Sequence, residues 1–268
     1  MATPEQDPNS GIRAEWRTIS RGRMHARVAD TDARHSDPPV VLVHGLVISS
    51  AYMVPLMQVM RGDFRVYAPD LPGFGDSDKP PQALTLEELA DALAEWIDTM
   101  ALDRPVLLGN SLGCQIMLHL AVRHPDKVRA LILQGPTDDP GARSALRQIA
   151  RLAVNATREP SFGLMPARDY WKAGLGRARR TFQYLLADRP EQRLPLVRQP
   201  TLVVRGSVDP VVSAEWASRI VDLLPDARLR VLPGLAHTIN FHHPLELHRV
   251  SRPFILQQTE ARQAARMA

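Results

Sequence analysis

Short apolar runs alternate along the 268-residue chain with longer segments in which apolar residues recur at helical spacing. The apolar runs predict buried strands at residues 40–43, 64–68, 106–108, 128–133, 201–206 and 229–232. The periodic segments predict helices at residues 52–60, 86–100, 112–124 and 214–224 and from Leu245 onward. Residues 15–19 and 24–28 predict an N-terminal hairpin. Strands that alternate with helices of about 10–15 residues predict an α/β fold, with a mostly parallel central sheet and helices on both faces.

Residues 136–199 interrupt this alternation. The segment is rich in arginine, its pattern is helical, and it contains no convincing apolar strand. We therefore expect residues 136–199 to form a helical cap inserted over one edge of the sheet. Residues 1–135 and 200–268 are then expected to form the core domain. The working groups of such a sheet lie at the carboxyl ends of its strands.

The composition is that of an ordinary globular protein, with 44% hydrophobic and 23% charged residues. The first residues lack the apolar stretch of a signal peptide, and no run of about 18 apolar residues could span a bilayer. The single cysteine, Cys114, excludes an internal disulfide. We expect a cytoplasmic protein with no membrane partner.

The formal net charge is +4, but no basic run with interleaved aromatic residues and no zinc-finger spacing supports nucleic-acid binding. The charge is uneven: residues 136–199 hold eleven Arg and one Lys against six Asp or Glu, a net charge of +6, and the remainder carries −2. The arginines of interest are Arg143, Arg147 and Arg151 at helical spacing, and Arg177, Arg179 and Arg180 in a second cluster. Two interpretations stay open, a solvated surface or arginines that face a cleft and favour a substrate with a carboxylate.

Candidate chemistry begins at the sequence Gly109-Asn110-Ser111-Leu112-Gly113, between a predicted strand and a predicted helix. The pattern G-x-S-x-G is typical of a nucleophile elbow, a strained turn in which small residues two positions before and after the serine avoid backbone clashes. The first free N–H groups of the following helix would point toward an anion beside Ser111. A tight turn that happens to contain serine is the alternative interpretation.

A serine nucleophile needs a base and an acid that orients the base, and in this architecture they follow in the order Ser, Asp or Glu, His. The sequence has Asp209 after the strand at 201–206 and His237 after the strand at 229–232. The three residue types therefore occur in the required order at three predicted strand ends. We predict that Ser111, Asp209 and His237 form a catalytic triad. Asp138 and Asp139, after the strand at 128–133, are the alternative acid.

These residues resemble those of the α/β-hydrolase fold family across nearly the whole chain outside the insertion. His44-Gly45 resembles the family's oxyanion loop, and residues 70–77 resemble its D-x-P-G-x-G-x-S loop. Residues 203–209 resemble the strand end that carries the acid, and Pro244 has the expected spacing of seven residues after the histidine. His242 departs from the pattern, because the family usually has Glu at that position.

The resemblance implies an α/β-hydrolase fold with a helical cap. It also implies an oxyanion hole formed by the backbone N–H groups of Leu46 and Leu112, with no cofactor and no metal. The implied activity is hydrolysis of a small acyl compound, a carboxylic ester or a lactone, through an acyl-enzyme on Ser111. The resemblance leaves the oligomeric state open.

Two other functions are weighed against this one. Asn110 before the serine resembles the meta-cleavage-product hydrolases, which cut a carbon–carbon bond with the same triad, although these enzymes often have Trp where Thr238 follows His237. A ligand-binding member of the fold without catalysis is the third interpretation.

Several other residues have simpler interpretations. The histidines at 242, 243 and 248 could suggest a metal site, but no carboxylate at ligand spacing supports one. His44 is expected to fix its loop by hydrogen bonds, and Cys114 to be a small buried core residue.

Overall fold

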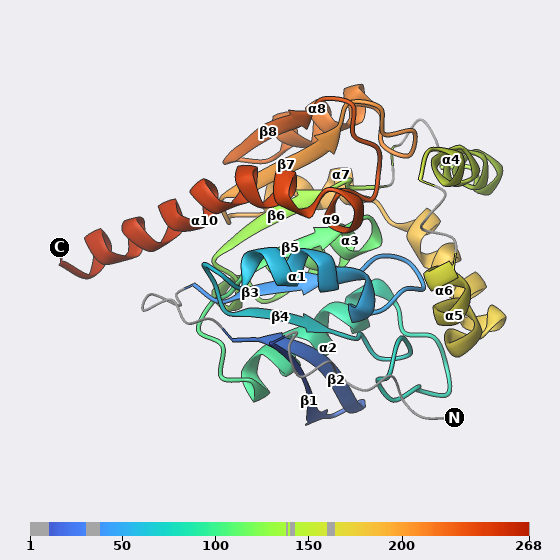
Figure 1. The fold of residues 1–268 in the computed structure, drawn as a ribbon, viewed down its shortest axis with the longest axis horizontal. Helices are drawn as coiled ribbons and strands as arrows, with labels where there is room; N and C mark the ends of the chain where they lie inside the picture. The colour runs from blue at the N-terminus through green and yellow to red at the C-terminus, as the bar shows by residue number, and fades with distance from the viewer. Residues whose placement is uncertain (1–10, 31–37, 138, 140–142, 160–163, 268) are drawn as a thin grey trace.

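The computed structural model describes residues 11–30, 38–137, 139, 143–159 and 164–267. These residues form one eight-stranded sheet in the order β1-β2-β4-β3-β5-β6-β7-β8 (Figure 1). The strands are β1 (Ile12–Ile19), β2 (Gly22–Ala29), β3 (Val40–Val43), β4 (Val66–Pro69), β5 (Val106–Asn110), β6 (Ala130–Gln134), β7 (Thr201–Gly206) and β8 (Ala227–Leu232). β1 and β2 form the predicted hairpin, β2 pairs antiparallel with β4, and the pairs from β4 to β8 are parallel.

The central strands are buried on both faces because alternate residues enter two different cores. Leu107 and Leu131 belong to one core with α2 (Leu86–Thr99), α3 (Leu112–Arg123) and α8 (Ala214–Leu223). Their neighbours Leu108 and Ile132 belong to the other core with α1 (Val54–Met60) and α10 (Pro244–Met267). The continuous apolar runs in the sequence are the consequence. The predicted fold class is confirmed.

Some boundaries differ from the prediction. The strand expected at 64–68 begins at Val66, because Phe64 is buried in the core shared with α10, where its ring packs against His248. The helix expected at 52–60 starts with a 3₁₀ turn at Ser50–Met53, and the strand expected at 128–133 begins at Ala130. A short helix after His237, α9 (Ile239–His242), was not expected from the sequence. The sequence signals specify the elements better than their ends.

One predicted boundary is reproduced in detail. Thr85 and Glu88 form a capping box at the start of α2, in which each side chain accepts a hydrogen bond from the other residue's backbone N–H. The reciprocal hydrogen bonds satisfy two of the N–H groups that a helix start leaves without intrahelical partners.

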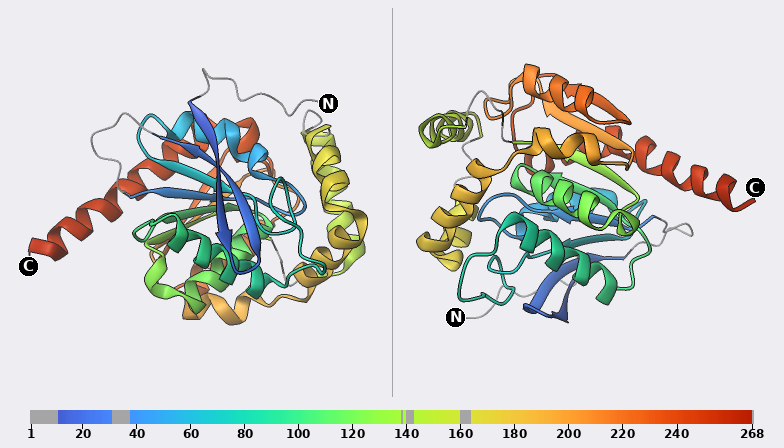
Figure 2. Two further views of the ribbon diagram at one scale, coloured as in Figure 1. Left: turned by 90° about the horizontal axis from the view of Figure 1, so that it is seen from below. Right: turned by 180° about the vertical axis from the view of Figure 1, so that it is seen from behind.

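The described residues between β6 and β7 form helices and no strand. They are α4 (Ala145–Arg158), α5 (Leu164–Ala173), α6 (Leu175–Ala187), α7 (Pro190–Arg193) and a 3₁₀ turn at Leu194–Leu196. Figures 1 and 2 show α4, α5 and α6 together at one end of the molecule, opposite the free end of α10. The division into a core domain and a cap domain stays a prediction.

Across the described ranges, no helix combines the length and the apolar character that crossing a bilayer requires.

Candidate active site

Ser111 occupies a strained turn between β5 and α3. Its backbone has φ 56° and ψ −120°, a conformation that residues with a side chain seldom adopt. The Ser111 N–H donates to the carbonyl of Gln134 over 3.1 Å, and the Ser111 carbonyl accepts from Cys114 N–H over 3.0 Å. These two hydrogen bonds tie the turn to β6 and to the first turn of α3.

The two glycines of the turn are required by packing. A Cβ atom on Gly113 would lie 2.4 Å from the carbonyl oxygen of Val43 and 2.8 Å from that of His44. A Cβ atom on Gly109 would lie 2.5 Å from the sulfur of Met117. Backbone oxygens cannot retreat as a side chain can, so α3 reaches its position against β3 only because residue 113 is glycine.

His237 and Asp209 meet behind the cavity. His237 Nδ1 lies 2.9 Å from Asp209 Oδ2, and both side chains are buried. The other oxygen of Asp209 accepts from the backbone N–H groups of Val211 and Val212, at 2.7 and 3.1 Å. The carboxylate therefore has partners for both oxygens and presents one of them to the ring.

The pKa values of this pair move in opposite directions. Burial lowers the pKa of His237, but the charge and hydrogen bond of Asp209, with a further contribution from the charge of Glu159, raise it above its ordinary value overall. Burial raises the pKa of Asp209, but His237 and the two backbone N–H groups lower it below its ordinary value. Each group therefore favours the charged form of the other: the raised pKa of His237 favours the imidazolium, and the lowered pKa of Asp209 favours the carboxylate.

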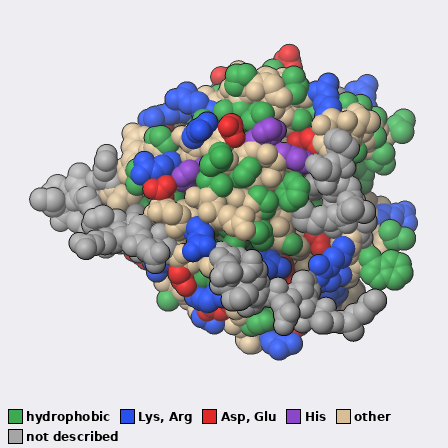
Figure 3. Space-filling view, viewed as in Figure 1, with side chains coloured by type: hydrophobic (Ala, Val, Ile, Leu, Met, Phe, Trp, Pro, Cys, Tyr) green, Lys and Arg blue, Asp and Glu red, His purple; other side chains and the backbone are tan. Residues whose placement is uncertain are grey.

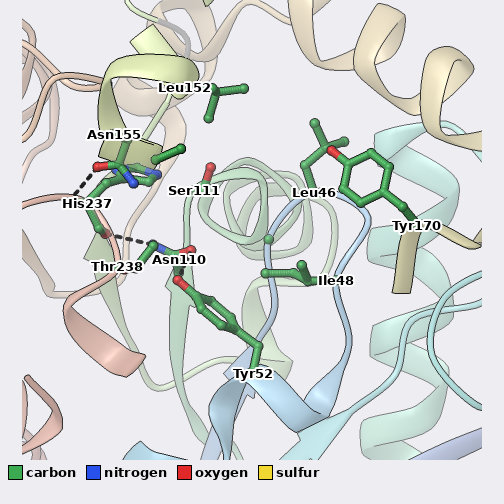
Figure 4. A pocket seen from close by; sticks show the side chains of 12 residues that line it. Leu46, Ile48, Tyr52, Asn110, Ser111, Leu152, Asn155, Tyr170, His237 and Thr238 are labelled. Atoms are coloured by element: carbon green, nitrogen blue, oxygen red, sulfur yellow. Dashed lines mark hydrogen bonds between the residues drawn. The ribbon is translucent and has the colours of Figure 1, made fainter. Parts of the chain in front are cut away.

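A cavity of about 340 Å³ connects these elements (Figure 4). Its lining residues are Gly45, Leu46, Ile48, Tyr52, Asn110, Ser111, Leu152, Asn155, Ala156, Tyr170, His237 and Thr238. Figure 4 shows Ser111 between the side formed by His237 and the side formed by Leu46. Leu112 is the first residue of α3, so its N–H has no partner within the helix. Of the five residues singled out by the sequence, Leu46, Ser111 and His237 line this cavity. Asp209 is bonded to His237, and Leu112 directly follows Ser111.

The Nε2 atom of His237 is buried and has no hydrogen-bond partner among the described residues. Because Nδ1 is engaged by Asp209, Nε2 is the ring nitrogen left for chemistry. An unsatisfied buried nitrogen is costly in a folded protein, and a ligand or substrate proton in the cavity would satisfy it.

The sequence did not reveal the polar network that holds the His237 backbone. The His237 carbonyl accepts from Gln134 Nε2 at 2.7 Å and from Asn110 Nδ2 at 3.4 Å. Asn110 also donates to Gln134 Oε1 at 2.9 Å and accepts from the Tyr52 hydroxyl at 3.2 Å. Gly135 lies directly under the imidazole, because a Cβ atom there would be 2.8 Å from its Cε1. In the sequence, the only signal for a role of Gln134 and Gly135 at the site is their position at the end of a predicted strand.

Two side chains at the end of α4 bind the same loop. Asn155 Oδ1 accepts from the His237 N–H at 3.3 Å, and both oxygens of Glu159 accept from the Thr238 N–H at 3.2 Å. Asn155 Nδ2 also donates to Glu159 at 2.6 Å. His242, the departure from the family pattern, lies 3.5 Å from Glu159 and 2.7 Å from the Thr238 hydroxyl. The carboxylate near the histidine loop therefore comes from the inserted segment.

His44 forms the hydrogen bonds expected of a residue that fixes its loop. Its Nδ1 lies 2.9 Å from the Gly45 carbonyl, and its Nε2 accepts from the Leu71 N–H at 3.1 Å. Burial lowers the pKa of His44, although Asp70 opposes this effect. Both ring nitrogens are engaged, which leaves no free nitrogen to act as a base.

Asp139, one of the two alternative acids, is bonded elsewhere, and His237 Nδ1 is paired with Asp209. Asp139 accepts from Ser213 at 3.0 Å and from Arg151 at 3.2 Å. Asp138 lies outside the described residues.

His248 and Cys114 have structural partners, and the Cys114 thiol donates to the Gly109 carbonyl at 3.1 Å. His248 pairs with Asp63 at 2.9 Å, and burial raises the pKa of the Cys114 thiol above its ordinary range. Among the described residues, His25, Asp70 and Asp76 are close enough to share a cation. However, buried Asp70 is already occupied by the His25 ring at 2.8 Å and by backbone N–H donors, so the cluster fixes the 70–77 loop.

The arginines of residues 136–199 attach these helices to their surroundings. Arg143 pairs with Glu191 at 2.5 Å, and Arg151 bonds to the Val211 carbonyl at 3.0 Å. Arg177 donates to the carbonyl of Gln82 at 3.1 Å. No arginine or lysine is among the described residues that line the cavity. The interpretation that arginines face the cleft therefore has no support from the cavity.

Comparison with known proteins shows that this chain is similar to hydrolases. A family model described as alpha/beta hydrolase fold matches residues 38–160. The 2-(acetamidomethylene)succinate hydrolase of Mesorhizobium japonicum is 28% identical over 84% of this chain and 89% of its own length. The 2-hydroxymuconate semialdehyde hydrolase of a Pseudomonas species is 24% identical over 97% of this chain and 99% of its own length.

Solved structures give the same fold. The enol-lactonase of Burkholderia xenovorans superposes with a TM-score of 0.74 at 21% identity, over 90% of this chain and all of the enol-lactonase chain. The crystal structure of E-2-(acetamidomethylene)succinate hydrolase superposes with a TM-score of 0.74 at 25% identity, over 91% of this chain and 99% of that chain.

We predict that Gly113→Ala destabilises the fold by about 1–3 kcal/mol, because the added methyl group clashes with the Val43 carbonyl. Chemical denaturation monitored by circular dichroism measures the free energy of unfolding. Gly176→Ala, in α6, is the matched control because no atom lies within 4 Å of its Cβ position. Equal stability of the two variants would contradict the packing argument.

We also predict that Glu159→Gln lowers the pKa of His237, because the substitution removes a negative charge that favours the protonated ring while keeping a hydrogen-bonding side chain. Titration of the His237 ring by NMR measures this shift directly. Glu191→Gln removes a carboxylate of the same helical segment that pairs with Arg143 instead, and it is expected to leave the His237 pKa unchanged. An unchanged pKa in Glu159→Gln would show that its role is only to hold the backbone.

Proposed function

Because the chain is a hydrolase of the α/β-hydrolase fold family, we propose that Ser111 attacks the acyl carbon of a neutral carboxylic ester or lactone. Ser111, His237 and Asp209 are proposed as the catalytic triad. The observation that carries the proposal is the buried His237–Asp209 pair beside a strained serine in one cavity. This arrangement supplies a nucleophile, a base and a group that orients the base.

The proposed reaction proceeds in two steps. His237 Nε2 takes the proton of the Ser111 hydroxyl as the oxygen bonds to the acyl carbon, and it then gives that proton to the departing alkoxide. A lactone ring opens at this step, and its alcohol stays on the same molecule. Water, deprotonated by the same nitrogen, attacks the ester on Ser111, releases the carboxylic acid and restores the serine. Asp209 holds the ring through Nδ1 and stabilises its cationic form.

The negative charge that develops on the acyl oxygen is proposed to bind the backbone N–H groups of Leu46 and Leu112. Leu46 lines the cavity on the side away from His237, and Leu112 begins α3 directly after the serine. Donors fixed by the backbone need no reorganisation during the reaction, and each contributes about 3–4 kcal/mol at the transition state.

The cavity lining supports a neutral and partly apolar substrate. Leu46, Ile48, Leu152 and Ala156 provide apolar surface, and the polar groups of the lining are amides and hydroxyls apart from His237. Binding an anionic group is unfavourable in free energy when the group leaves its hydration shell and finds no cation in the cavity. The 2-hydroxymuconate semialdehyde hydrolase match keeps carbon–carbon bond hydrolysis as the second candidate, but Thr238 after His237 and the uncharged lining favour an ester or lactone.

The helices α4, α5 and α6 are proposed to act as the cap of this site, with residues 1–135 and 200–268 as the core. Leu152 and Ala156 of α4 and Tyr170 of α5 line the cavity opposite the sheet. The part of the substrate that does not react would therefore contact this segment.

We predict that Ser111→Ala and His237→Ala each lower kcat by a factor on the order of 10⁶ and leave the fold intact, and that Asp209→Asn costs somewhat less. Turnover of p-nitrophenyl esters gives the rates, and a fluorophosphonate probe is expected to label the wild-type protein stoichiometrically and Ser111→Ala not at all. Asp139→Asn is the matched control and should be nearly silent. A Ser111→Ala variant that is labelled or retains substantial activity would refute the assignment.

We further predict a preference for neutral acyl groups. The kcat/KM of p-nitrophenyl butyrate is expected to exceed that of the p-nitrophenyl monoester of succinic acid by about tenfold or more, because the second carboxylate meets no cation in the cavity. Spectrophotometric initial rates at matched concentrations test this. Faster turnover of the anionic ester, or of a 2-hydroxy-6-oxo-dienoate, would instead favour the carbon–carbon hydrolase.

A further inference from the structure

Helix α4 turns its polar face toward the protein and its apolar face toward solvent. Gln148, Asn155 and, directly after the helix, Glu159 are buried, whereas Leu146 is 79% exposed and Ile149 is 56% exposed. This is the reverse of the usual orientation, in which an amphipathic helix buries its apolar stripe.

A second group of exposed apolar side chains lies where α5 meets α6. Trp171 is 89% exposed and Leu175 is 81% exposed. Figure 3, in the same view as Figure 1, shows hydrophobic side chains at the end of the molecule where Figure 1 places α4, α5 and α6. We call Leu146, Ile149, Val154, Trp171 and Leu175 the apolar rim. Single exposed apolar residues are ordinary, but several large apolar side chains exposed on the helices at one end of the molecule indicate an interaction site.

The apolar rim is held outward by the bonds that α4 makes at the active site. Asn155 and Glu159 accept from the backbone N–H groups of His237 and Thr238. If α4 rotated to bury its apolar face, these two N–H groups would lose their partners and two buried polar side chains would move to solvent. The exposure is therefore a property of the assembled site.

The rim lies on the same helical segments as three of the residues that line the cavity. Leu152 and Ala156 of α4 line the cavity on one side and Tyr170 of α5 lines it on another, and Leu152 and Tyr170 are themselves part-exposed. Figure 4 shows Leu152 and Tyr170 on different sides of Ser111. A partner seated on the rim would therefore lie beside the cavity that contains Ser111.

The positive charge of residues 136–199 favours an anionic partner. Residues 136–199 carry a net charge of +6, and Arg147, Arg158, Arg179 and Arg180 are exposed on the helices that bear the rim. Apolar side chains flanked by arginine are the pattern of a helix that lies in the surface of an anionic bilayer. A second copy of the chain would bring two such cationic segments together, and their repulsion opposes that arrangement.

We propose that the apolar rim docks on an anionic lipid surface and that an apolar ester or lactone enters the cavity from that surface. The docking is independent of the reaction, and only the statement about the substrate rests on the proposed function. The sequence predicts no membrane partner because it has no segment that could span a bilayer. A helix that lies in the lipid surface does not need such a segment.

Co-sedimentation of the full-length Ser111→Ala variant with vesicles tests the docking without hydrolysis. Vesicles of phosphatidylglycerol and phosphatidylcholine are expected to bind the protein at least about tenfold more strongly than pure phosphatidylcholine, and salt is expected to reduce this advantage. Adding Ile149→Glu or Trp171→Glu should lower the partition coefficient about tenfold each, because a large apolar side chain no longer enters the lipid. Leu245→Glu, 53% exposed on α10, is the matched control and should bind as before.

Three outcomes would overturn the proposal. These are equal binding to neutral and anionic vesicles, equal losses in Leu245→Glu and Trp171→Glu, and a dimer in sedimentation velocity that Trp171→Glu dissociates. The rim variants with Ser111 restored should keep the wild-type kcat/KM on a short water-soluble ester. Loss of that activity in Ser111→Ala alone tests the proposed function, so the two proposals fail separately.

Discussion

The close approach of α3 to the end of β3 is the constraint on which the rest of the site depends. Gly113 sits against the carbonyl oxygens of Val43 and His44, and this contact fixes the direction in which the chain leaves the left-handed turn at Ser111. The strain of that turn persists because hydrogen bonds and packing on both sides determine it. Once Ser111 is fixed, the proposed base and the proposed oxyanion donors can occupy only a narrow range of positions around it.

The histidine loop meets this requirement because groups from three elements hold it. Its carbonyl is bound by Gln134 at the end of β6, its N–H by Asn155 of α4, and its ring by Asp209 beyond β7. Gly206 lets the loop pass close to β7, since a Cβ atom there would lie 2.1 Å from the Leu235 carbonyl. The His237 ring is therefore oriented by the strand ends and by α4 together, which links the position of α4 to the geometry of the site.

The bonds between α4 and the site leave apolar side chains of α4 exposed at the surface. Helix α4 uses its polar face to satisfy buried N–H groups at the site, and the apolar face of the same helix is then left in water. Exposed apolar area is unfavourable by about 25 cal/mol per Å² relative to burial. Exposed apolar area on the helices that line the cavity fits the proposed apolar partner.

The sequence by itself determined the order of strands and helices, the α/β class and the positions of Ser111, Asp209 and His237 at strand ends, because parallel strands place their carboxyl ends at one edge. It also determined that α4 has a polar and an apolar face, since 3.6-residue periodicity is local. Only the tertiary structure decided which face of α4 turns inward and that Glu159 binds the histidine loop. It also decided that the described arginines of residues 136–199 lie outside the cavity lining. Periodicity specifies which residues share a face, but the hydrogen-bonding groups that this face meets lie far away in the chain, and folding alone brings them together.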